Sequence, residues 1–486
     1  MTYNTSKIDD VLKKLFGSDE KFTITSTSSN GLIIKRTADN TTVLISHIDQ
    51  QLIDNPLMLE TVLKGNFSNS SQCTELILRD DTELILRDDI LLNSRENKKQ
   101  SWIVTFKKDF KPINHKFHDN IQVKTIYDCV HHGMHCIASK TDIENNLGNE
   151  IVESYVPDQL MHITAQRERI IHDKVSMSTS TQQNGAFIFR IGANNGSQKS
   201  GDGIGTLATR SDINVFIVDT GIAPHPDLNI VGGINFISTN PSLWADANGH
   251  GTHVSGIVGA QDNSIGIVGV APGVRLWAVR VLGADGSGYI STIIAGLNWI
   301  LSNRNILWTG YGVVNMSLGG GATAPLDTAV NNLINNGIIV CVAAGNASVD
   351  AMTSSPARVA NAVTVGATAS IPSYNFLASY SNYGSVIDIL APGSTIMSTY
   401  LSGGYATLSG TSMACPVVTG TVALMLSSQH INGTNLQLVT NIRNNLVTNS
   451  SIINPKYFDG TIGSNPTVSI PANKSVTTVS AWAGIY

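Results

Sequence analysis

The sequence predicts an α/β protein whose mainly parallel sheet is flanked by helices. Charged residues are concentrated in residues 1–180, which contain 21 Lys and Arg and 25 Asp and Glu, whereas residues 181–486 contain only 10 and 11. In this second part, which is rich in Gly, Ala, Val and Ser, short apolar runs alternate with segments of helical periodicity. Such alternation implies parallel strands joined by right-handed helical crossovers, with both faces of the sheet covered.

Six apolar runs bounded by Gly, Pro or Asn predict the buried strands. They are Ile213–Asp219, Arg275–Leu282, Gly312–Leu318, Ile338–Gly345, Ala362–Gly366 and Val386–Ala391. Between them, Ser291–Arg304 and Leu326–Asn336 carry apolar residues at helical spacing, and Gly337 marks the end of the second helix. In sheets of this kind functional residues lie at the carboxyl ends of strands and in the loops that follow, so chemistry is expected there.

The first hundred residues contain an octapeptide repeat. The sequence TELILRDD occupies Thr74–Asp81 and again Thr82–Asp89. Two adjacent copies indicate a local duplication, because a solenoid needs three or more repeats. No chemistry is assigned to residues 1–100.

The overall composition excludes several classes of protein. A net charge of −5 gives no basic surface for nucleic acid and no polybasic membrane patch. The five cysteines are too few and too scattered for a disulfide framework or a CxxC metal site. No apolar stretch approaches the roughly 20 residues that span a bilayer, and Met1–Glu20 lacks the continuous apolar segment of a secretory signal. We therefore expect a soluble globular protein with neither nucleic acid nor a membrane as partner.

Three segments place a chemically active side chain at the end of a strand or the start of a helix. Asp219 ends the strand INVFIVD, His250 lies in NGHGTHVSG where a helix begins, and Ser412 lies in SGTSMACP at a Gly-to-helix junction. Asp219 and Ser412 each have a plain structural explanation by themselves, a loop cap and a Ser N-cap, and His253 is expected to be a packed helix residue. His250 and His253 could also suggest a metal site, although the HExxH pattern is absent.

Together the three side chains make a more specific pattern. A hydroxyl nucleophile needs a base within hydrogen-bond reach, and that base needs a carboxylate to orient it. The boxes VDTGI, HGTHVSG and GTSMA, in this order, resemble the three signature boxes of the subtilisin-like serine proteases, or subtilases. The resemblance spans Gln182–Arg443. It implies a subtilisin-like fold in which Asp219 orients the base, His250 is the general base and Ser412 is the nucleophile.

The resemblance also implies residues that bind the substrate. Asn346, in VCVAAGN, is placed where the family has the side chain that stabilises the oxyanion. The edge strand that pairs with the substrate corresponds to Gly286, Ser287 and Gly288. The two walls of the first specificity pocket correspond to Ser317, Leu318 and Gly319, and to Ala343, Ala344 and Gly345. Main-chain pairing of this kind adds the substrate as a strand, so we expect polypeptide substrates and broad side-chain tolerance.

No cofactor is expected for catalysis, and no catalytic metal. The segments PHPDL and QDNSIGI resemble a structural calcium site of the family, with Asp227, Asn263 and the carbonyls near Gln261, Ile265 and Ile267 as ligands. Oxygen ligands of this type suit Ca²⁺.

The charged first part also resembles the family. Ser101–Phe110 and Ile151–Ala165 resemble the opening and closing strands of the inhibitor-type propeptide, a small α+β domain. This resemblance implies a propeptide over 101–165, a processing linker over 166–181, a peptidase domain over 182–445 and a C-terminal tail over 446–486. Gln182–Ile191 resembles the start of mature proteinase-K-like members, which places processing within Met161–Gln183.

The implied function is that of a serine endopeptidase that forms an acyl-enzyme and is made as a self-processing zymogen, with its own propeptide as intramolecular inhibitor. A large parallel domain folds slowly, which gives such a detachable module a purpose. Because the family is largely secreted and this sequence shows no export signal, an intracellular, particle-packaged or unconventional route is expected.

Alternative interpretations lead to different experimental outcomes. A catalytically silent binding protein on the same fold would lack a residue of the site, yet Asp219, His250, Ser412 and Asn346 are all present. A metal-dependent hydrolase using His250 and His253 would be inhibited by chelators and not by serine-directed phosphonates. Residues 101–165 could instead form an unrelated α/β module.

Overall fold

The computed structural model of the chain describes five strands between residues 22 and 86, residues 99–164, several positions between 182 and 207, and residues 211–369, 377–427 and 435–451. The predicted processing linker (166–181) and most of the predicted C-terminal tail lie outside the described residues. The chain divides into two compact units: one comprises Met1–Lys99 with Ser139–Asn145, and the other comprises Gln100–Ala138 with Asn146–Tyr486.

The first unit contains a five-stranded sheet in the order β1-β2-β3-β4-β5. The strands are β1 (Phe22–Ser26), β2 (Leu32–Arg36), β3 (Thr42–Ser46), β4 (Thr74–Leu78) and β5 (Leu84–Leu86). The two copies of the octapeptide supply β4 and β5, which pair antiparallel with Leu76 opposite Leu86. The duplication therefore forms a pair of neighbouring strands.

The second unit begins with a four-stranded antiparallel sheet in the order β7-β8-β6-β9. Its strands are β6 (Gln100–Phe106), β7 (Gln122–Tyr127), β8 (Gly133–Ala138) and β9 (Val152–Pro157), with a short 3₁₀ helix, η1 (Pro112–Asn114), after β6. Helix α5 (Lys140–Ile151) follows β8 along the chain, and the division between the two units falls within it, after Asn145. Ile103, Val104 and Phe106 of β6 are fully buried, because β6 lies in the middle of the sheet. Strand β10 (Leu160–Ile163) follows β9 after two residues.

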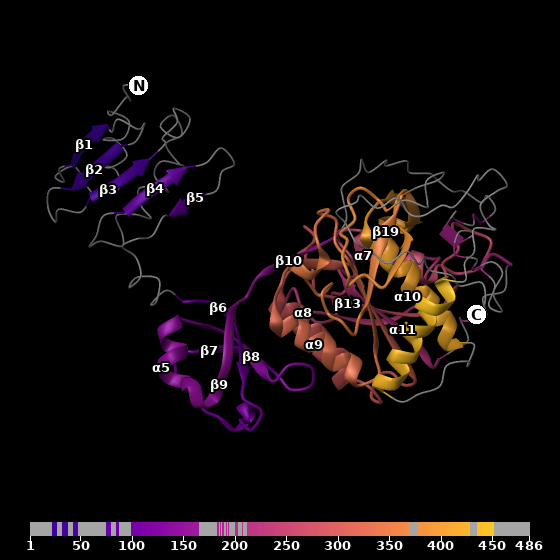
Figure 1. The fold of residues 1–486 in the computed structure, drawn as a ribbon, viewed down its shortest axis with the longest axis horizontal. Helices are drawn as coiled ribbons and strands as arrows, with labels where there is room; N and C mark the ends of the chain where they lie inside the picture. Colours follow the sequence, from indigo (N-terminus) through magenta and orange to yellow (C-terminus); the bar gives the residue numbers. More distant parts are fainter. Residues whose placement is uncertain are drawn as a thin grey trace. The chain divides into compact units, whose positions relative to one another are not determined.

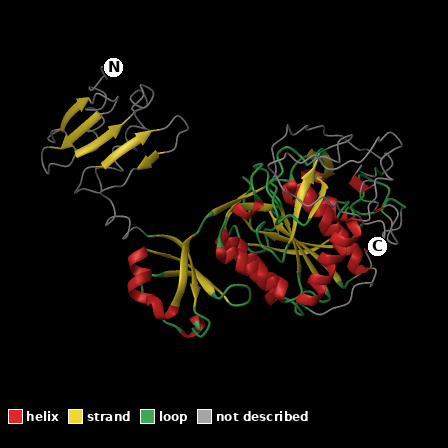
Figure 2. Ribbon diagram, in the orientation of Figure 1, coloured by secondary structure: helices red, strands yellow, loops and turns green. Residues whose placement is uncertain are grey.

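The larger part of this unit is built on a seven-stranded parallel sheet in the order β12-β13-β11-β15-β17-β19-β20 (Figures 1 and 2). The strands are β11 (Ile213–Asp219), β12 (Ile230–Asn235), β13 (Arg275–Arg280), β15 (Tyr311–Met316), β17 (Ile339–Ala343), β19 (Val363–Thr368) and β20 (Ile389–Pro392). Every residue of β11 is buried, because this strand is central and both its faces are covered.

Helices flank the sheet. They are α7 (His250–Gly259), α8 (Ile290–Ser302), α9 (Ala324–Asn335), α10 (Thr411–Ser427) and α11 (Leu436–Ser451). Helices α7 and α10 pack against each other and against β11, and α8 packs against α9 and β11. Short antiparallel strands complete the unit: β14 (Ser287–Tyr289), β16 (Leu318–Gly321), β18 (Ser354–Ser355), β21 (Ile396–Thr399) and β22 (Tyr405–Leu408). Two further 3₁₀ turns are η4 (Ala351–Thr353) and η5 (Leu401–Gly403).

Helix α10 is buried on all sides and contains Pro416. Proline has no N–H, so the carbonyl of Ser412, four residues earlier, loses its helical hydrogen bond. The hydroxyl of Ser317, which lies between β15 and β16, donates to this carbonyl instead at 2.9 Å. The first turn of α10 is thereby attached to the neighbouring strands.

The six strands predicted from the sequence are all present, with ends that shift by up to three residues. Strand β12 was not predicted, because Gly232 and Gly233 weaken its pattern. A Cβ at Gly232 would lie 2.6 Å from the ring of Trp277, and one at Gly233 would lie 2.7 Å from the ring of Trp244, so these glycines make room for indole rings. Among the described residues, no helix combines the length and the apolar character needed to cross a membrane.

Candidate active site

Asp219 and His250 are in direct contact at the carboxyl end of β11. His250 Nδ1 lies 2.8 Å from Asp219 Oδ1 and 3.0 Å from Oδ2. Both side chains are buried, and the N–H of Thr220 also donates to Asp219 Oδ1 at 2.7 Å. The carboxylate is therefore fixed by the backbone that follows the strand, and it holds the Nδ1 edge of the imidazole ring.

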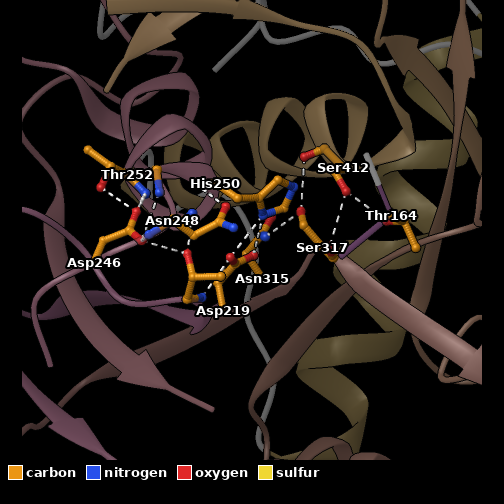
Figure 3. A network of polar contacts seen from close by, with 12 residues as sticks. Thr164, Asp219, Asp246, Asn248, His250, Thr252, Asn315, Ser317 and Ser412 are labelled. Atoms are coloured by element: carbon orange, nitrogen blue, oxygen red, sulfur yellow. Dashed lines mark hydrogen bonds and ion pairs between the residues drawn. The ribbon is translucent and has the colours of Figure 1, made fainter. Parts of the chain in front are cut away.

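A second carboxylate positions the helix that carries His250. Asp246 Oδ1 accepts from the N–H groups of Asn248 and Gly249, and its Oδ2 accepts from the N–H and the hydroxyl of Thr252 (Figure 3). These bonds satisfy N–H groups at the start of α7, which have no partner within the helix. Sequence reasoning missed Asp246, although an acidic side chain just before a helix is a typical capping signal.

Ser412 lies in the first turn of α10, facing the end of β15. Its Oγ donates to the carbonyl of Ser317 at 3.1 Å and lies 2.7 Å from Thr164 Oγ1 (Figure 3). Among the described residues, His250 Nε2 is buried without a hydrogen-bond partner. The expected hydrogen bond between Ser412 and His250 is thus not formed here, because the serine hydroxyl is turned toward Ser317 and Thr164.

Two N–H donors converge on the main-chain carbonyl of Thr164. One is the side-chain amide of Asn346, and the other is the backbone N–H of Ser412 at 3.4 Å. Asn346 Oδ1 is in turn held at 2.9 Å by both the N–H and the hydroxyl of Thr411. Donors arranged around one carbonyl oxygen in this way can stabilise negative charge that develops on it.

The Leu160–Ile163 strand, β10, lies between two edge strands of the larger part of the unit. It pairs antiparallel with β14, with Met161 opposite Gly288, and antiparallel with β16, with Ile163 opposite Leu318. At its end, Ile163 N–H donates to the carbonyl of Gly286 at 3.0 Å, and Thr164 N–H donates to the carbonyl of Ser317 at 3.2 Å. The segment is therefore bound by its main chain, and its last carbonyl reaches Ser412.

Side chains of β10 alternate between the protein and solvent. Met161 is fully buried, whereas Leu160 is 42% exposed. A Cβ at Gly320 would lie 2.6 Å from the Met161 sulfur, and a Cβ at Gly286 would lie 2.9 Å from Ile163 Cδ1. These two glycines leave the space that Met161 and Ile163 occupy.

The structure groups most of the predicted substrate-binding residues around β10. Gly286, Ser287 and Gly288 flank one edge of it, and Ser317, Leu318 and Gly319 flank the other. Ala343, Ala344 and Gly345 lie at the end of β17. The N–H of Ala344 donates to the carbonyl of Val365 at 2.9 Å, and the N–H of Gly345 donates to the Thr411 hydroxyl at 3.1 Å.

The four-stranded sheet also contacts helices α8 and α9. Asp158 accepts from the N–H of Ser291 at 3.0 Å and from its hydroxyl at 2.7 Å, which caps the start of α8. Asn298 of α8 accepts from the N–H of Cys129 at 2.9 Å, and Asn332 of α9 donates to the carbonyl of Val130 at 2.9 Å. A negative charge at a helix N-terminus is stabilised by the helix dipole.

His253 makes hydrogen bonds that differ from those of His250. Its Nε2 lies 3.0 Å from the carbonyls of both Ile396 and Ala406. Burial lowers the pKa of His253 to about 3, so the ring is neutral and its Nε2–H donates to these carbonyls. His253 therefore holds β21 and β22 against α7. Among the described residues, no cluster of three or more His, Cys, Asp or Glu forms a metal site.

The loop that resembles a calcium site gathers oxygen atoms around Asp227. Asp227 Oδ1 accepts from the amide of Asn263 at 2.9 Å, and its Oδ2 accepts from the N–H of Ile267 at 3.2 Å. The Gln182 amide donates to the carbonyls of Gln261 and Ile267 at 2.6 and 3.0 Å. Ile265 donates its N–H to Asn263 Oδ1. Burial raises the pKa of Asp227 to about 6.

Residues 210–469, more than half of the chain, match the model of Peptidase_S8, the subtilase family. The chain belongs to the subtilase family. It is 46% identical over 237 residues to Subtilisin BL of Lederbergia lenta, which covers 49% of this chain and 84% of the relative. It is 42% identical over 258 residues to Subtilisin E of Bacillus subtilis (strain 168), which covers 52% of this chain and 64% of the relative.

Among solved structures, a match described as "Crystal structure of a cold adapted subtilisin-like serine proteinase" is 41% identical, covers 49% of this chain and 82% of that chain, and has a TM-score of 0.44. This subtilase is a subtilisin-type serine endopeptidase and hence a hydrolase. The predicted subtilisin-like α/β fold is confirmed.

Thr164 and Gln182 make two further contacts with predicted site residues. The sequence placed both residues within the processing segment Met161–Gln183 and did not predict their contacts. Both lie far along the chain from their partners: Thr164 is 248 residues from Ser412, and Gln182 is 79 residues from Gln261. No local pattern around either residue indicates these contacts, because they depend on tertiary structure.

Proposed function

We propose that Ser412 is the nucleophile of peptide hydrolysis, His250 its general base and then general acid, and Asp219 the carboxylate that orients His250. Attack of Ser412 Oγ on the substrate carbonyl transfers its proton to His250 Nε2, and Asp219 stabilises the imidazolium that forms. His250 then protonates the leaving amine, and water hydrolyses the acyl-enzyme. The direct contact of His250 Nδ1 with Asp219 supports these roles.

The oxyanion of this reaction is stabilised by Asn346 and by the N–H of Ser412. The observation that carries the proposal is the position of the Thr164 carbonyl, which accepts from both of these donors beside Ser412. A carbonyl held in this way lies where a scissile carbonyl is expected to lie. The first processing cut is therefore the bond between Thr164 and Ala165.

The predicted propeptide, residues 101–165, acts as an intramolecular inhibitor, which this cut separates from the peptidase one residue before the predicted end. Main-chain pairing of β10 with β14 and β16 binds the segment in the manner of a substrate strand. The contacts of Asp158, Cys129 and Val130 with α8 and α9 hold the four-stranded sheet in place after cleavage. Several contact regions joined in one chain bind more tightly than the strand alone.

Labelling with a fluorophosphonate, followed by N-terminal sequencing and intact-mass measurement, tests this function. We expect the probe to attach to Ser412 of the processed enzyme and the released inhibitor to end at Thr164. A first cut elsewhere, or a probe that attaches to a different residue, contradicts the proposal. Inhibition by chelators without any fluorophosphonate labelling supports the metal-dependent alternative instead.

We propose further that the Asp227 loop binds a structural calcium ion. The available ligands are the Asp227 carboxylate, the carbonyls of Gln261 and Ile267, and the side-chain amide of Gln182. A half-turn of this amide brings its oxygen, in place of its nitrogen, toward the two carbonyls. Asn263 joins them if it also turns, at the cost of its bond from Ile265. This oxygen-only set, which includes a buried carboxylate, fits the preference of Ca²⁺.

Calcium removal is expected to lower the thermal stability of the processed enzyme. A ligand at 100 times its Kd stabilises the folded state by about 2.7 kcal/mol, which for a domain of this size shifts the Tm by roughly 5–10 °C. Scanning calorimetry with calcium and with EGTA measures the difference. In Asp227→Asn the Tm should no longer depend on calcium, and an equal calcium dependence in this variant refutes the site.

A further inference from the structure

Thr164 contacts the nucleophile Ser412 with its side chain in addition to its main-chain carbonyl. Thr164 Oγ1 lies 2.7 Å from Ser412 Oγ, and Ser412 Oγ donates to the carbonyl of Ser317 at 3.1 Å (Figure 3). Because Ser412 has a single hydroxyl proton and that proton is given to Ser317, the Thr164 hydroxyl is the donor in the contact between the two hydroxyls. Both hydrogen bonds hold Ser412 Oγ in one orientation.

This orientation is unsuited to catalysis. Activation of a serine hydroxyl requires a hydrogen bond to the base, yet His250 Nε2 is buried and has no such partner in the part of the chain that the structure describes. His250 itself is held by Asp219, so the missing element is the rotation of Ser412. The contact that opposes this rotation comes from the segment to be cleaved.

We propose that Thr164 is a positioning residue that slows self-processing, because its hydroxyl holds Ser412 Oγ away from His250 Nε2. This inference rests on the proposed function of Ser412 and His250. It assigns a regulatory role to one hydroxyl group of the inhibitor segment: the same contact delays the first cut and strengthens binding of the cleaved segment. The residue before the scissile bond thereby sets the time at which activity appears.

The step that is delayed is the formation of the acyl-enzyme. Ser412 Oγ forms a bond to the Thr164 carbonyl carbon, and its proton passes to His250 Nε2. The bond from that carbon to the nitrogen of Ala165 then breaks, and the nitrogen takes the proton from His250. Rotation of Ser412 toward His250 must come first, and it breaks the bonds to Thr164 and Ser317.

Thr164→Val is the matched test, because valine keeps the branched shape and removes only the hydroxyl. A neutral hydrogen bond is worth about 0.5–1.5 kcal/mol, so we expect the full-length chain to process about 2–10 times faster. Thr164→Ser, which keeps the hydroxyl and loses the methyl group, should process at close to the wild-type rate. The rate is the appearance of the fragment that begins at Ala165, followed by mass spectrometry after cell-free synthesis.

The two variants separate a positioning role from a role in fitting the pocket. If shape matters and the hydroxyl does not, the serine variant changes and the valine variant matches the wild type, which overturns the inference. A wild-type chain that never cuts after Thr164 contradicts the proposed function itself. Equal processing rates in the wild type and Thr164→Val contradict only the role of the Thr164 hydroxyl.

A second measurement does not depend on folding of the variant precursor. The peptides QLMHIT and QLMHIV, which correspond to Gln159–Thr164 with and without the final hydroxyl, are compared as inhibitors of the processed enzyme. We expect the inhibition constant of the valine peptide to be about 2–10 times higher, because it lacks the bond to Ser412. Equal constants overturn the inference.

Discussion

Ser412→Ala is expected to abolish peptide hydrolysis and to leave the full-length chain uncut. In subtilisin itself, loss of the nucleophile lowers kcat by about 10⁶-fold, and the remaining rate comes from binding and the oxyanion donors. We expect a loss of the same order here, because alanine has no group that can form the acyl-enzyme. A peptide substrate and a gel of the precursor measure both effects.

The control for this variant is Ser302→Ala at the end of α8, where the hydroxyl is exposed. It should process and hydrolyse peptides like the wild type. The Ser412→Ala variant should still bind the inhibitor segment, because the pairing of β10 with β14 and β16 does not involve the Ser412 side chain. If Ser412→Ala processes itself at the wild-type rate, Ser412 is not the nucleophile.

Asn346→Ala has the second largest expected effect. Removal of one oxyanion donor from subtilisin lowers kcat by about 10²–10³-fold, and we expect the same order here. The loss should fall mainly on kcat, because the charge on the carbonyl oxygen develops only in the transition state. Steady-state kinetics with a peptide substrate separate kcat from KM.

Thr411→Val is the matched comparison for Asn346. It removes the hydroxyl that donates to Asn346 Oδ1 and accepts from the N–H of Gly345. The bond from the Thr411 N–H to Asn346 Oδ1 and the amide donor of Asn346 stay in place. Its kcat should fall about 10-fold or less, because only one of the two hydrogen bonds that hold Asn346 Oδ1 is lost. If Asn346→Ala changes KM alone, or no more than Thr411→Val does, Asn346 is not an oxyanion donor.

The part of the fold and site that the sequence predicts is the part encoded locally. Asp219 ends an apolar run, and a buried parallel strand has this pattern, so both the strand and its carboxyl end could be predicted. The position of Ser412 follows in the same way from a Gly-to-helix junction. Strand β12 could not be predicted, because its glycines accommodate two tryptophan rings that lie elsewhere in the sequence.

The orientation of the site could not be predicted either. Residue types and their order indicate an acid, a base and a nucleophile, yet they do not indicate which way a serine hydroxyl points. In this structure that direction is set by Thr164 and Ser317, which come from segments 248 and 95 residues away. The contact of Gln182 with Gln261, 79 residues away, depends on long-range packing in the same way.

The proline in α10 has a mechanical consequence. Because Pro416 has no N–H to donate to the Ser412 carbonyl, the Ser317 hydroxyl replaces one backbone hydrogen bond of the helix. The main-chain carbonyl of Ser317 accepts a hydrogen bond from the N–H of Thr164. A peptide chain that binds to Ser317 is thus linked by two successive hydrogen bonds to the backbone of Ser412, so a shift of Ser317 would move the bound chain and the nucleophile together.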